Sequence, residues 1–248
     1  MKSKFFGIAI MSIAISGCGG GGGGGGGLPV SLGPTTVTKN NLTNVAGTAG
    51  NTSIVVSGLS GSAATYTRVP TLNNGPFAAY ARTVGGTIYI VYLAQDSGVE
   101  ASFGGEVNNA GKGVRGALFK RTATLVLPTT GTASYNGSYA GIVQTTATND
   151  SFAVSGNVNI QADFATNRVN GTITNRRSGA TPFAAVTLSP STLDTSGKYA
   201  GSASNTIGAT GTYAGIIAGG TANQTAGVLE LNTTGGVSRE TGAFIARR

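Results

Sequence analysis

The sequence has no histidine, no tryptophan and a single cysteine among its 248 residues. Without histidine, the chain cannot build a Ser-His-Asp triad, a Cys-His pair or a metal site with an imidazole ligand. Without a second cysteine, it cannot form an intrachain disulfide or a four-cysteine zinc site. We therefore expect no metal and no cofactor.

Acidic residues are scarce as well. The chain has 8 aspartates and glutamates against 16 lysines and arginines, and only 10% of its residues are charged. The carboxylates are Asp96, Glu100, Glu106, Asp150, Asp163, Asp194, Glu230 and Glu240. A glycosidase needs two carboxylates that converge on one bond, and no spacing here favours such a pair. The sequence predicts that the protein is not an enzyme.

The basic residues and one glycine motif have simple explanations. Basic pairs stand at Lys120-Arg121, Arg176-Arg177 and Arg247-Arg248. They could meet anionic lipid headgroups or acidic partners, or they could be solvated charges in turns. The segment 111–116 matches G-x-G-x-x-G, but a strand signal follows it where a dinucleotide fold needs a helix. No aromatic-rich basic surface is evident, so we expect no nucleic-acid partner.

The N-terminus has the order of a secretory signal peptide. Lys2 and Lys4 precede a short apolar run, and residues 15–18 (ISGC) resemble a bacterial lipobox. The resemblance implies cleavage after residues 1–17 and lipidation of Cys18, so that acyl chains would bind the protein to a membrane. The residue after Cys18 is Gly19 rather than Asp, which by the sorting rule for such lipoproteins favours the outer membrane of a Gram-negative cell.

An unbroken glycine run, residues 19–27, follows the cysteine. It has no side chain to bury and maximal backbone freedom. We expect residues 18–44 to form a flexible tether with a reach on the order of 25–30 Å.

From residue 53 onward, strand signals are frequent and no 3.6-residue period is sustained. Residues 45–127 are predicted to form a smaller β-rich region, in which 87–93 is apolar on both faces and reads as a covered central strand. The segment Pro128-Thr129-Thr130-Gly131 is the candidate boundary before residues 128–248.

Residues 128–248 read as an all-β domain of long strands. Residues 151–164 alternate apolar and polar side chains, and Gly156 alone interrupts the apolar face. Eight strands are predicted, at 135–144, 151–164, 168–176, 181–188, 198–204, 211–217, 226–231 and 241–247. Closure into an antiparallel up-and-down barrel would remove the edges of such a sheet.

The tripeptide Tyr-Ala-Gly recurs at residues 139–141, 199–201 and 213–215. Glycine in a strand lets a sheet bend at a barrel corner, and a neighbouring tyrosine can cover the gap that it leaves. A structural role for these tyrosines is favoured over a role as a ligand platform.

The second half of the chain resembles the barrel domain of transferrin-binding protein B lobes and factor H-binding lipoproteins. The resemblance covers about half of the chain and is carried by LPTTGTASYNGSYAG (127–141), ADF (162–164), VNGTITN (169–175), GTYAG (211–215), AGVL (226–229) and TGAF (241–244). It implies a water-soluble eight-stranded barrel on a lipid anchor that acts by binding. It transfers no ligand and no binding residue.

These features predict an outer-membrane lipoprotein, surface-exposed and non-enzymatic, that binds a macromolecule or solute. Three alternatives stay open: an envelope-accessory lipoprotein without a soluble ligand, an integral membrane barrel, and an enzyme. A membrane barrel would carry aromatic girdles, and the chain has no tryptophan. The sequence does not decide between the periplasmic and the external face.

Overall fold

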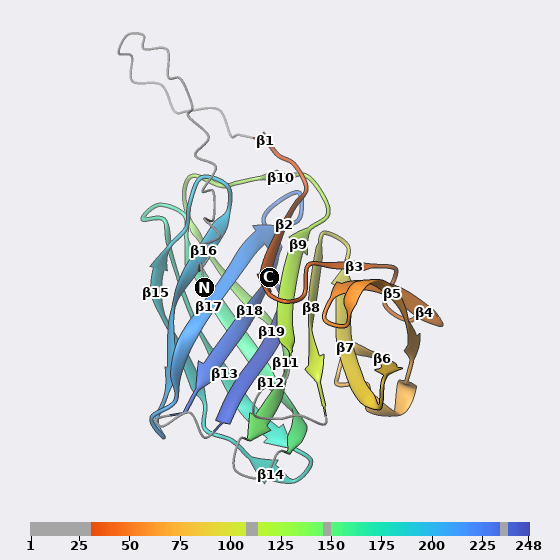
Figure 1. Cartoon of the computed structure of the whole chain (residues 1–248). Helices are drawn as coiled ribbons and strands as arrows, with labels where there is room; N and C mark the ends of the chain where they lie inside the picture. Colours follow the sequence, from red (N-terminus) through yellow and green to blue (C-terminus); the bar gives the residue numbers. More distant parts are fainter. Residues whose placement is uncertain (1–30, 108–113, 146–149, 234–237) are drawn as a thin grey trace, which may run out of the picture.

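The computed structural model describes residues 31–107, 114–145, 150–233 and 238–248, and within these ranges the protein is almost entirely β-structure. Figure 1 shows two sheets side by side, one closed into a barrel and one strongly curled. The expected signal peptide, Cys18 and the glycine run lie outside the described residues.

The barrel has eight strands, as the alternating patterns predict. They are β11 (Thr132–Thr145), β12 (Ser151–Asp163), β13 (Arg168–Ser178), β15 (Val186–Thr192), β16 (Lys198–Asn205), β17 (Thr210–Ala218), β18 (Gln224–Asn232) and β19 (Ser238–Arg247). Each strand pairs antiparallel with its sequence neighbour, and β11 pairs with β19 to close the ring. The strand expected at 181–188 is divided into β14 (Thr181–Pro182) and β15, and the interruption lies opposite the part of β13 that is distorted at Asn175, which has φ of 51°.

The second sheet has the order β2-β9-β8-β7-β6-β5-β4-β3. Its strands are β2 (Thr35–Asn40), β3 (Asn44–Ala46), β4 (Ser53–Gly58), β5 (Gly61–Arg68), β6 (Ala78–Val84), β7 (Thr87–Asp96), β8 (Val99–Glu106) and β9 (Arg115–Arg121), with a short 3-10 turn η1 (Pro70–Leu72) before β6. The expectation that 87–93 is a covered strand is confirmed. Val91 faces the core enclosed by the curled sheet, and Tyr92 faces the barrel.

The N-terminal segment is structured earlier than the sequence predicts. We expected a tether through residue 44, whereas β2 pairs with β9 from Thr35↔Arg121 to Asn40↔Gly116. The strand forms because it pairs with β9 and because Val37, its one apolar residue, packs against the apolar layer between the two sheets. Ahead of it, β1 (Ser31–Leu32) pairs with β10 (Leu125–Val126) at the barrel end where β11 begins.

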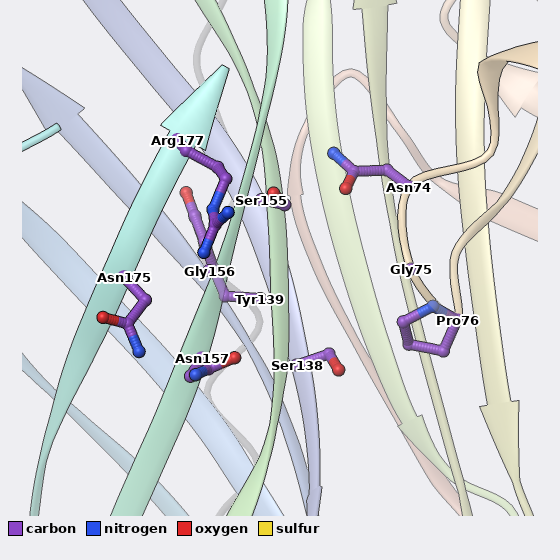
Figure 2. Close-up of a pocket in the computed structure, with 10 residues that line it drawn as sticks. All are labelled: Asn74, Gly75, Pro76, Ser138, Tyr139, Ser155, Gly156, Asn157, Asn175 and Arg177. Atoms are coloured by element: carbon purple, nitrogen blue, oxygen red, sulfur yellow. The ribbon is translucent and has the colours of Figure 1, made fainter. Parts of the chain in front are cut away.

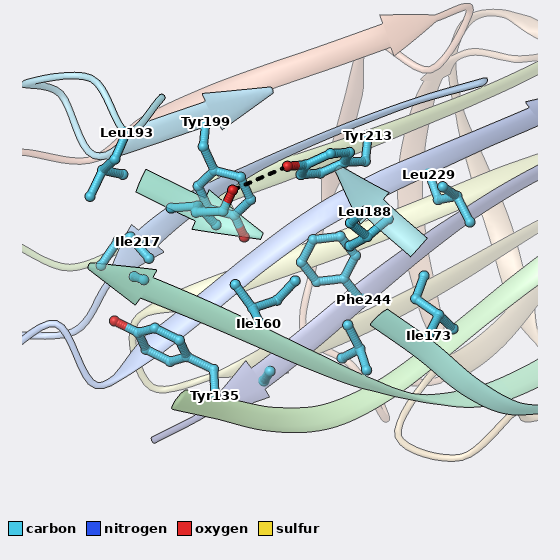
Figure 3. Close-up of a cluster of buried hydrophobic side chains, with 14 of the residues drawn as sticks. Tyr135, Ile160, Ile173, Leu188, Leu193, Tyr199, Tyr213, Ile217, Leu229 and Phe244 are labelled. Atoms are coloured by element: carbon cyan, nitrogen blue, oxygen red, sulfur yellow. Dashed lines mark hydrogen bonds between the residues drawn. The ribbon is translucent and has the colours of Figure 1, made fainter. Parts of the chain in front are cut away.

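The barrel interior is filled with apolar side chains from all eight strands (Figure 3). Aromatic rings lie over glycines of neighbouring strands, as predicted for the Tyr-Ala-Gly repeats. Tyr199 pairs with Gly215 across β16 and β17, and a Cβ atom on that glycine would lie 2.3 Å from the tyrosine Cζ. Phe244 covers Gly227 in the same manner. The glycines thus make room for large rings inside a narrow barrel.

The outer wall of the barrel is apolar where the second sheet covers it. Small outward side chains of β11, β17, β18 and β19 pack against β7, β8 and β9; they include Ala140, Ala214, Ala218, Ala226 and Ala243. Asp96 of β7 forms an ion pair with Arg247 of β19 at the rim of this layer. Arg121 of β9, which is buried, donates to the carbonyl oxygen of Ser196 in the barrel at 2.9 Å. The two sheets are therefore held together by a packed apolar layer, and an ion pair and a buried hydrogen bond also connect them; we call this contact the joint between the sheets.

Candidate functional site

A β-bulge in β13 determines which of its later side chains point into the barrel and which point out of it. Ser155 opposes Arg177 while Asn157 opposes Thr174, so β13 carries one residue more than β12 over this interval. Asn175 takes the left-handed conformation, with φ of 51°, which asparagine tolerates better than most residues. The bulge reverses which face of the wall each later residue occupies.

The first consequence of the bulge is a buried ion pair inside the barrel. Val169 and Ile173 point inward before the bulge, and Arg176 points inward after it. Its guanidinium pairs with Glu240 of β19 and also donates to the carbonyl oxygen of Ala184. The other carboxylate oxygen of Glu240 accepts a hydrogen bond of 2.7 Å from the Tyr139 hydroxyl.

Burial beside Glu240 keeps the Tyr139 hydroxyl protonated, so that it acts as a hydrogen-bond donor. Burial of Tyr139, together with the adjacent Glu240 carboxylate, holds the pKa of the tyrosine hydroxyl well above its usual value. The hydroxyl therefore stays protonated and donates to Glu240. The prediction of an apolar interior is confirmed for the core as a whole, and this network is its ionic exception.

The second consequence of the bulge is that Arg177 points outward, into a groove of about 370 Å³ on the barrel flank (Figure 2). One wall of the groove is the outer face of the barrel, and the other is the loop that follows η1. The lining residues are Asn74, Gly75, Pro76, Ser138, Tyr139, Ser155, Gly156, Asn157, Asn175 and Arg177.

The loop wall is fastened to the barrel. Asn74 donates from Nδ2 to the carbonyl oxygen of Val154 in β12 at 3.0 Å, and Asn73 accepts at Oδ1 from the backbone N–H of Ala79 at 3.1 Å. Two hydrogen bonds across the loop, one to each sheet, hold it at a fixed distance from β12. The groove is thus formed by both sheets of the protein.

The chemistry of the groove is that of recognition. Amide and hydroxyl groups dominate the lining, and Arg177 is its one charged side chain. Such groups donate and accept hydrogen bonds at neutral pH without changing protonation state, and the lining offers no acid–base pair. The site can bind a polar ligand and can place an anionic group against Arg177.

The basic pairs do not behave as the sequence suggested. Arg121 and Arg176 are each only 3% exposed, and Lys120 forms an ion pair with a buried glutamate of β8 at 2.7 Å. Arg247 forms an ion pair with Asp96 of the second sheet. For Arg121, Arg176 and Lys120, the interpretation as solvated turn charges or headgroup ligands is therefore wrong, because these side chains are used inside the fold. Arg177, Arg247 and Arg248 remain exposed, although Arg247 is ion-paired.

Several carboxylates also serve the fold. Glu100, Glu240 and Asp96 are in the three ion pairs formed among the described residues. Asp163 lies on the outer face of β12, as predicted, and accepts from the backbone N–H groups of Ala165 and Thr166 in the turn that follows. Hydrogen bonding from Thr166 lowers the pKa of its carboxyl below the usual value.

Other expectations concern residues that are only partly described. Cys18, the expected lipidation site, lies outside the described residues, as do residues 111–113 of the 111–116 glycine motif; Arg115 and Gly116 of that motif begin strand β9. Within the described ranges, no three His, Cys, Asp or Glu side chains are grouped as metal ligands, and no helix has the length and apolarity to cross a bilayer.

The groove itself was not predicted from the sequence. The bulge that builds it leaves one local signal, an asparagine inside a strand pattern directly before two arginines. Its other wall comes from residues 74–76, which are distant in the chain, and no spacing indicates that they lie opposite β12.

Comparisons with known proteins identify the architecture. No protein-family model matches the chain, and no curated protein matches its sequence. Among solved structures, intact Ap-TbpB, with its N and C lobes, matches over 86% of this chain and 45% of its own, with 10% identity and a TM-score of 0.53. A double mutant of the vaccine antigen transferrin-binding protein B from Haemophilus parasuis Hp5 matches over 86% of this chain and 44% of its own, with 14% identity and a TM-score of 0.53.

The chain spans less than half the length of these proteins. Identities this low establish the fold alone. The curled sheet joined to an eight-stranded barrel is a fold like that of transferrin-binding protein B.

Proposed function

We propose that the protein is a lipid-anchored binding protein of the outer membrane, without enzymatic activity, whose ligand occupies the flank groove. The observation that carries the proposal is the groove itself, which both sheets form and in which amides, hydroxyls and one arginine face the solvent. Proteins of similar fold are named for binding transferrin, so a protein ligand is one candidate and a polar solute or polymer is another.

The position of the first described residues supports a tethered orientation. β1 lies beside β10 at one barrel end, and the carbonyl oxygen of Gly33 accepts from Arg121 Nε at 3.0 Å. A membrane anchor at Cys18 would therefore pull on this end, while the opposite end, with β14, would point away (Figure 1). The groove on the flank would be accessible in that orientation.

The outer surface supports a barrel that stands in water. The exposed side chains of β12 and β13 include Asn157, Gln161, Asn170 and Thr172. A strand facing lipid would present apolar residues there. The apolar part of the outer wall is covered by the second sheet.

Two experiments test the proposal separately. Replacement of Cys18 by Ser should move the protein from the membrane fraction to the soluble fraction, and continued membrane retention would refute the lipid anchor. We further propose that the protein faces the outside of the cell, so protease treatment of intact cells should degrade the wild-type protein, and full protection would place it on the periplasmic face.

Binding is tested with the purified soluble form as bait. The wild type should capture a ligand that Arg177→Gln captures less well, while Lys39→Gln on strand β2 serves as a charge-matched control. Equal capture by the two variants would show that the groove is not the binding site.

A further inference from the structure

The groove is one end of a longer polar surface on the same barrel flank. We call this surface the amide strip; its residues are Ser134, Asn136 and Ser138 of β11, Asn157, Asn159 and Gln161 of β12, and Asn170, Thr172 and Thr174 of β13. They are the outward members of three adjacent strands, and each is exposed or half-buried. None is charged and none is apolar.

The amides of this strip are arranged in register. Asn159 donates from Nδ2 to Asn136 Oδ1 at 2.8 Å and to Ser134 Oγ at 3.1 Å. Asparagine is depleted in strands because its amide competes with the backbone. Four asparagines on one exposed sheet face therefore disfavour strand formation. They contribute nothing to the packing of the barrel core, because they point outward.

A second hollow, of about 410 Å³, lies at the other end of the strip, near the end of the barrel where β1 enters. Its polar lining includes Ser134, Gln161, Asp163, Arg168 and Asn170. Each hollow thus contains one arginine, Arg177 in the groove and Arg168 in the second hollow.

These two arginines are available to a ligand. Neither takes part in any of the three ion pairs among the described residues. Asp163 also faces the second hollow, but its Oδ1 already accepts from the turn backbone. Arg248 donates to the carbonyl oxygen of Thr132 at that hollow and adds positive charge. The surface is therefore weakly basic at its ends and neutral between them.

We propose that the amide strip binds an acidic polysaccharide chain that lies along the strands from one hollow to the other. The proposal rests on the binding function proposed above and names its ligand class. Side-chain amides and hydroxyls match sugar hydroxyls because both partners donate and accept hydrogen bonds. An arginine at each end takes a carboxylate or sulfate in bidentate geometry.

The spacing requires an extended ligand. Arg168 and Arg177 lie opposite Asp163 and Ser155, which are eight positions apart on β12, and this corresponds to about 26 Å at the usual strand rise. A monosaccharide cannot reach both arginines, whereas a chain gains from each repeated weak contact without new loss of translational freedom. A protein partner would need an apolar or aromatic anchor, and the strip provides none.

The direct test measures binding of alginate oligomers, dextran sulfate and neutral dextran to the purified soluble protein by titration calorimetry. The wild type should bind an acidic chain and not dextran. Arg168→Gln and Arg177→Gln should each weaken binding by about threefold to tenfold, as expected for a charge-assisted hydrogen bond at an exposed site. The losses should multiply in the double variant because the sites are far apart.

Two further variants make the test specific. Asn159→Asp places a carboxylate in the centre of the strip and should weaken binding through repulsion, with an unchanged far-ultraviolet circular dichroism spectrum. Lys39→Gln removes the same charge from the other sheet and should leave binding unchanged. Comparison of alginate with dextran sulfate distinguishes a carboxylate from a sulfate as the acidic group.

Equal affinity for dextran, an equal loss in Lys39→Gln, or no binding of either acidic chain would each overturn the inference. If the wild type and Arg168→Gln capture the same protein from solution equally well and neither binds an acidic chain, the binding function stands and the polysaccharide inference fails.

Discussion

Replacement of Arg176 by Met tests how much the buried ion pair between Arg176 and Glu240 contributes to the stability of the fold. In the folded protein, Arg176 is 3% exposed and Glu240 is 6% exposed. The methionine would fill much of the volume of the arginine stem, but among the described residues Glu240 would keep only the Tyr139 hydroxyl as a hydrogen-bond donor. The variant thus leaves a carboxylate without a counter-ion inside the barrel.

The magnitude follows from the burial of both partners. Removal of one member of a buried ion pair costs about 3–5 kcal/mol, because the remaining charge is desolvated without compensation. Removal of both charges by Arg176→Met with Glu240→Leu is close to neutral in comparable systems. The Tyr139 hydroxyl then loses its acceptor, at a cost of about 1–3 kcal/mol. We expect the double variant to be more stable than Arg176→Met alone.

Urea unfolding at pH 7, followed by far-ultraviolet circular dichroism, measures the effect. For Arg176→Met, the midpoint should fall by about 1–2 M at the denaturant sensitivity usual for small proteins. A fall that corresponds to less than about 1 kcal/mol would show that the Glu240 carboxylate does not depend on Arg176 for compensation of its burial. Strictly additive losses in the double variant would also refute the reasoning, since residues in contact must couple.

Three further predictions concern the ring packing and the joint between the sheets. Gly215→Ala should lower stability by about 1–3 kcal/mol, since its Cβ would overlap the buried ring of Tyr199; thermal unfolding measures this. Ala243→Leu should cost a similar amount by overpacking the layer between the sheets, where the alanine is 0% exposed. Burial opposes ionisation of Asp96, but hydrogen bonding from Arg247 prevails and lowers its carboxyl pKa from the ordinary 3.8. A lowered pKa stabilises the fold above pH 3.8 and loses its effect as pH falls further, so the difference in melting temperature between wild type and Asp96→Asn should be present at pH 7 and disappear in strong acid.

The alternation of apolar and polar residues predicted most of the barrel, because one face of every barrel strand is buried. Residues 151–164 alternate so regularly that the inward set of β12, including Val158 and Ile160, could be read directly. The pattern fails at β2, where Val37 is the one apolar residue in Thr35–Asn40 and polar neighbours make the strand resemble a linker. A short edge strand of this kind is specified by its partner β9 rather than by its own sequence.

The candidate site was harder to predict for a different reason. Arg176 and Arg177 are adjacent in sequence and were treated as one basic pair, but neighbours in a strand face opposite sides, and the bulge determines that Arg176 points into the core and Arg177 into the groove rather than the reverse. A single left-handed residue, Asn175, makes that difference, and asparagine occupies ordinary strand positions elsewhere in the same sheet. Local sequence cannot distinguish these cases, since the inward position of Arg176 depends on Glu240 lying opposite.

The abundance of small residues has a consequence for binding as well as for packing. Inward glycines admit large rings, and outward alanines such as Ala214 and Ala243 allow the second sheet to lie close against the barrel. The loop that carries Asn74 belongs to that second sheet, so the packed joint and the bond to Val154 together fix the groove before any ligand arrives. A site whose walls are already in place loses little conformational entropy on binding. Weak hydrogen bonds from amides and hydroxyls can then suffice for recognition, and a variant that loosens the joint, such as Ala243→Leu, should weaken ligand binding even though it touches no groove residue.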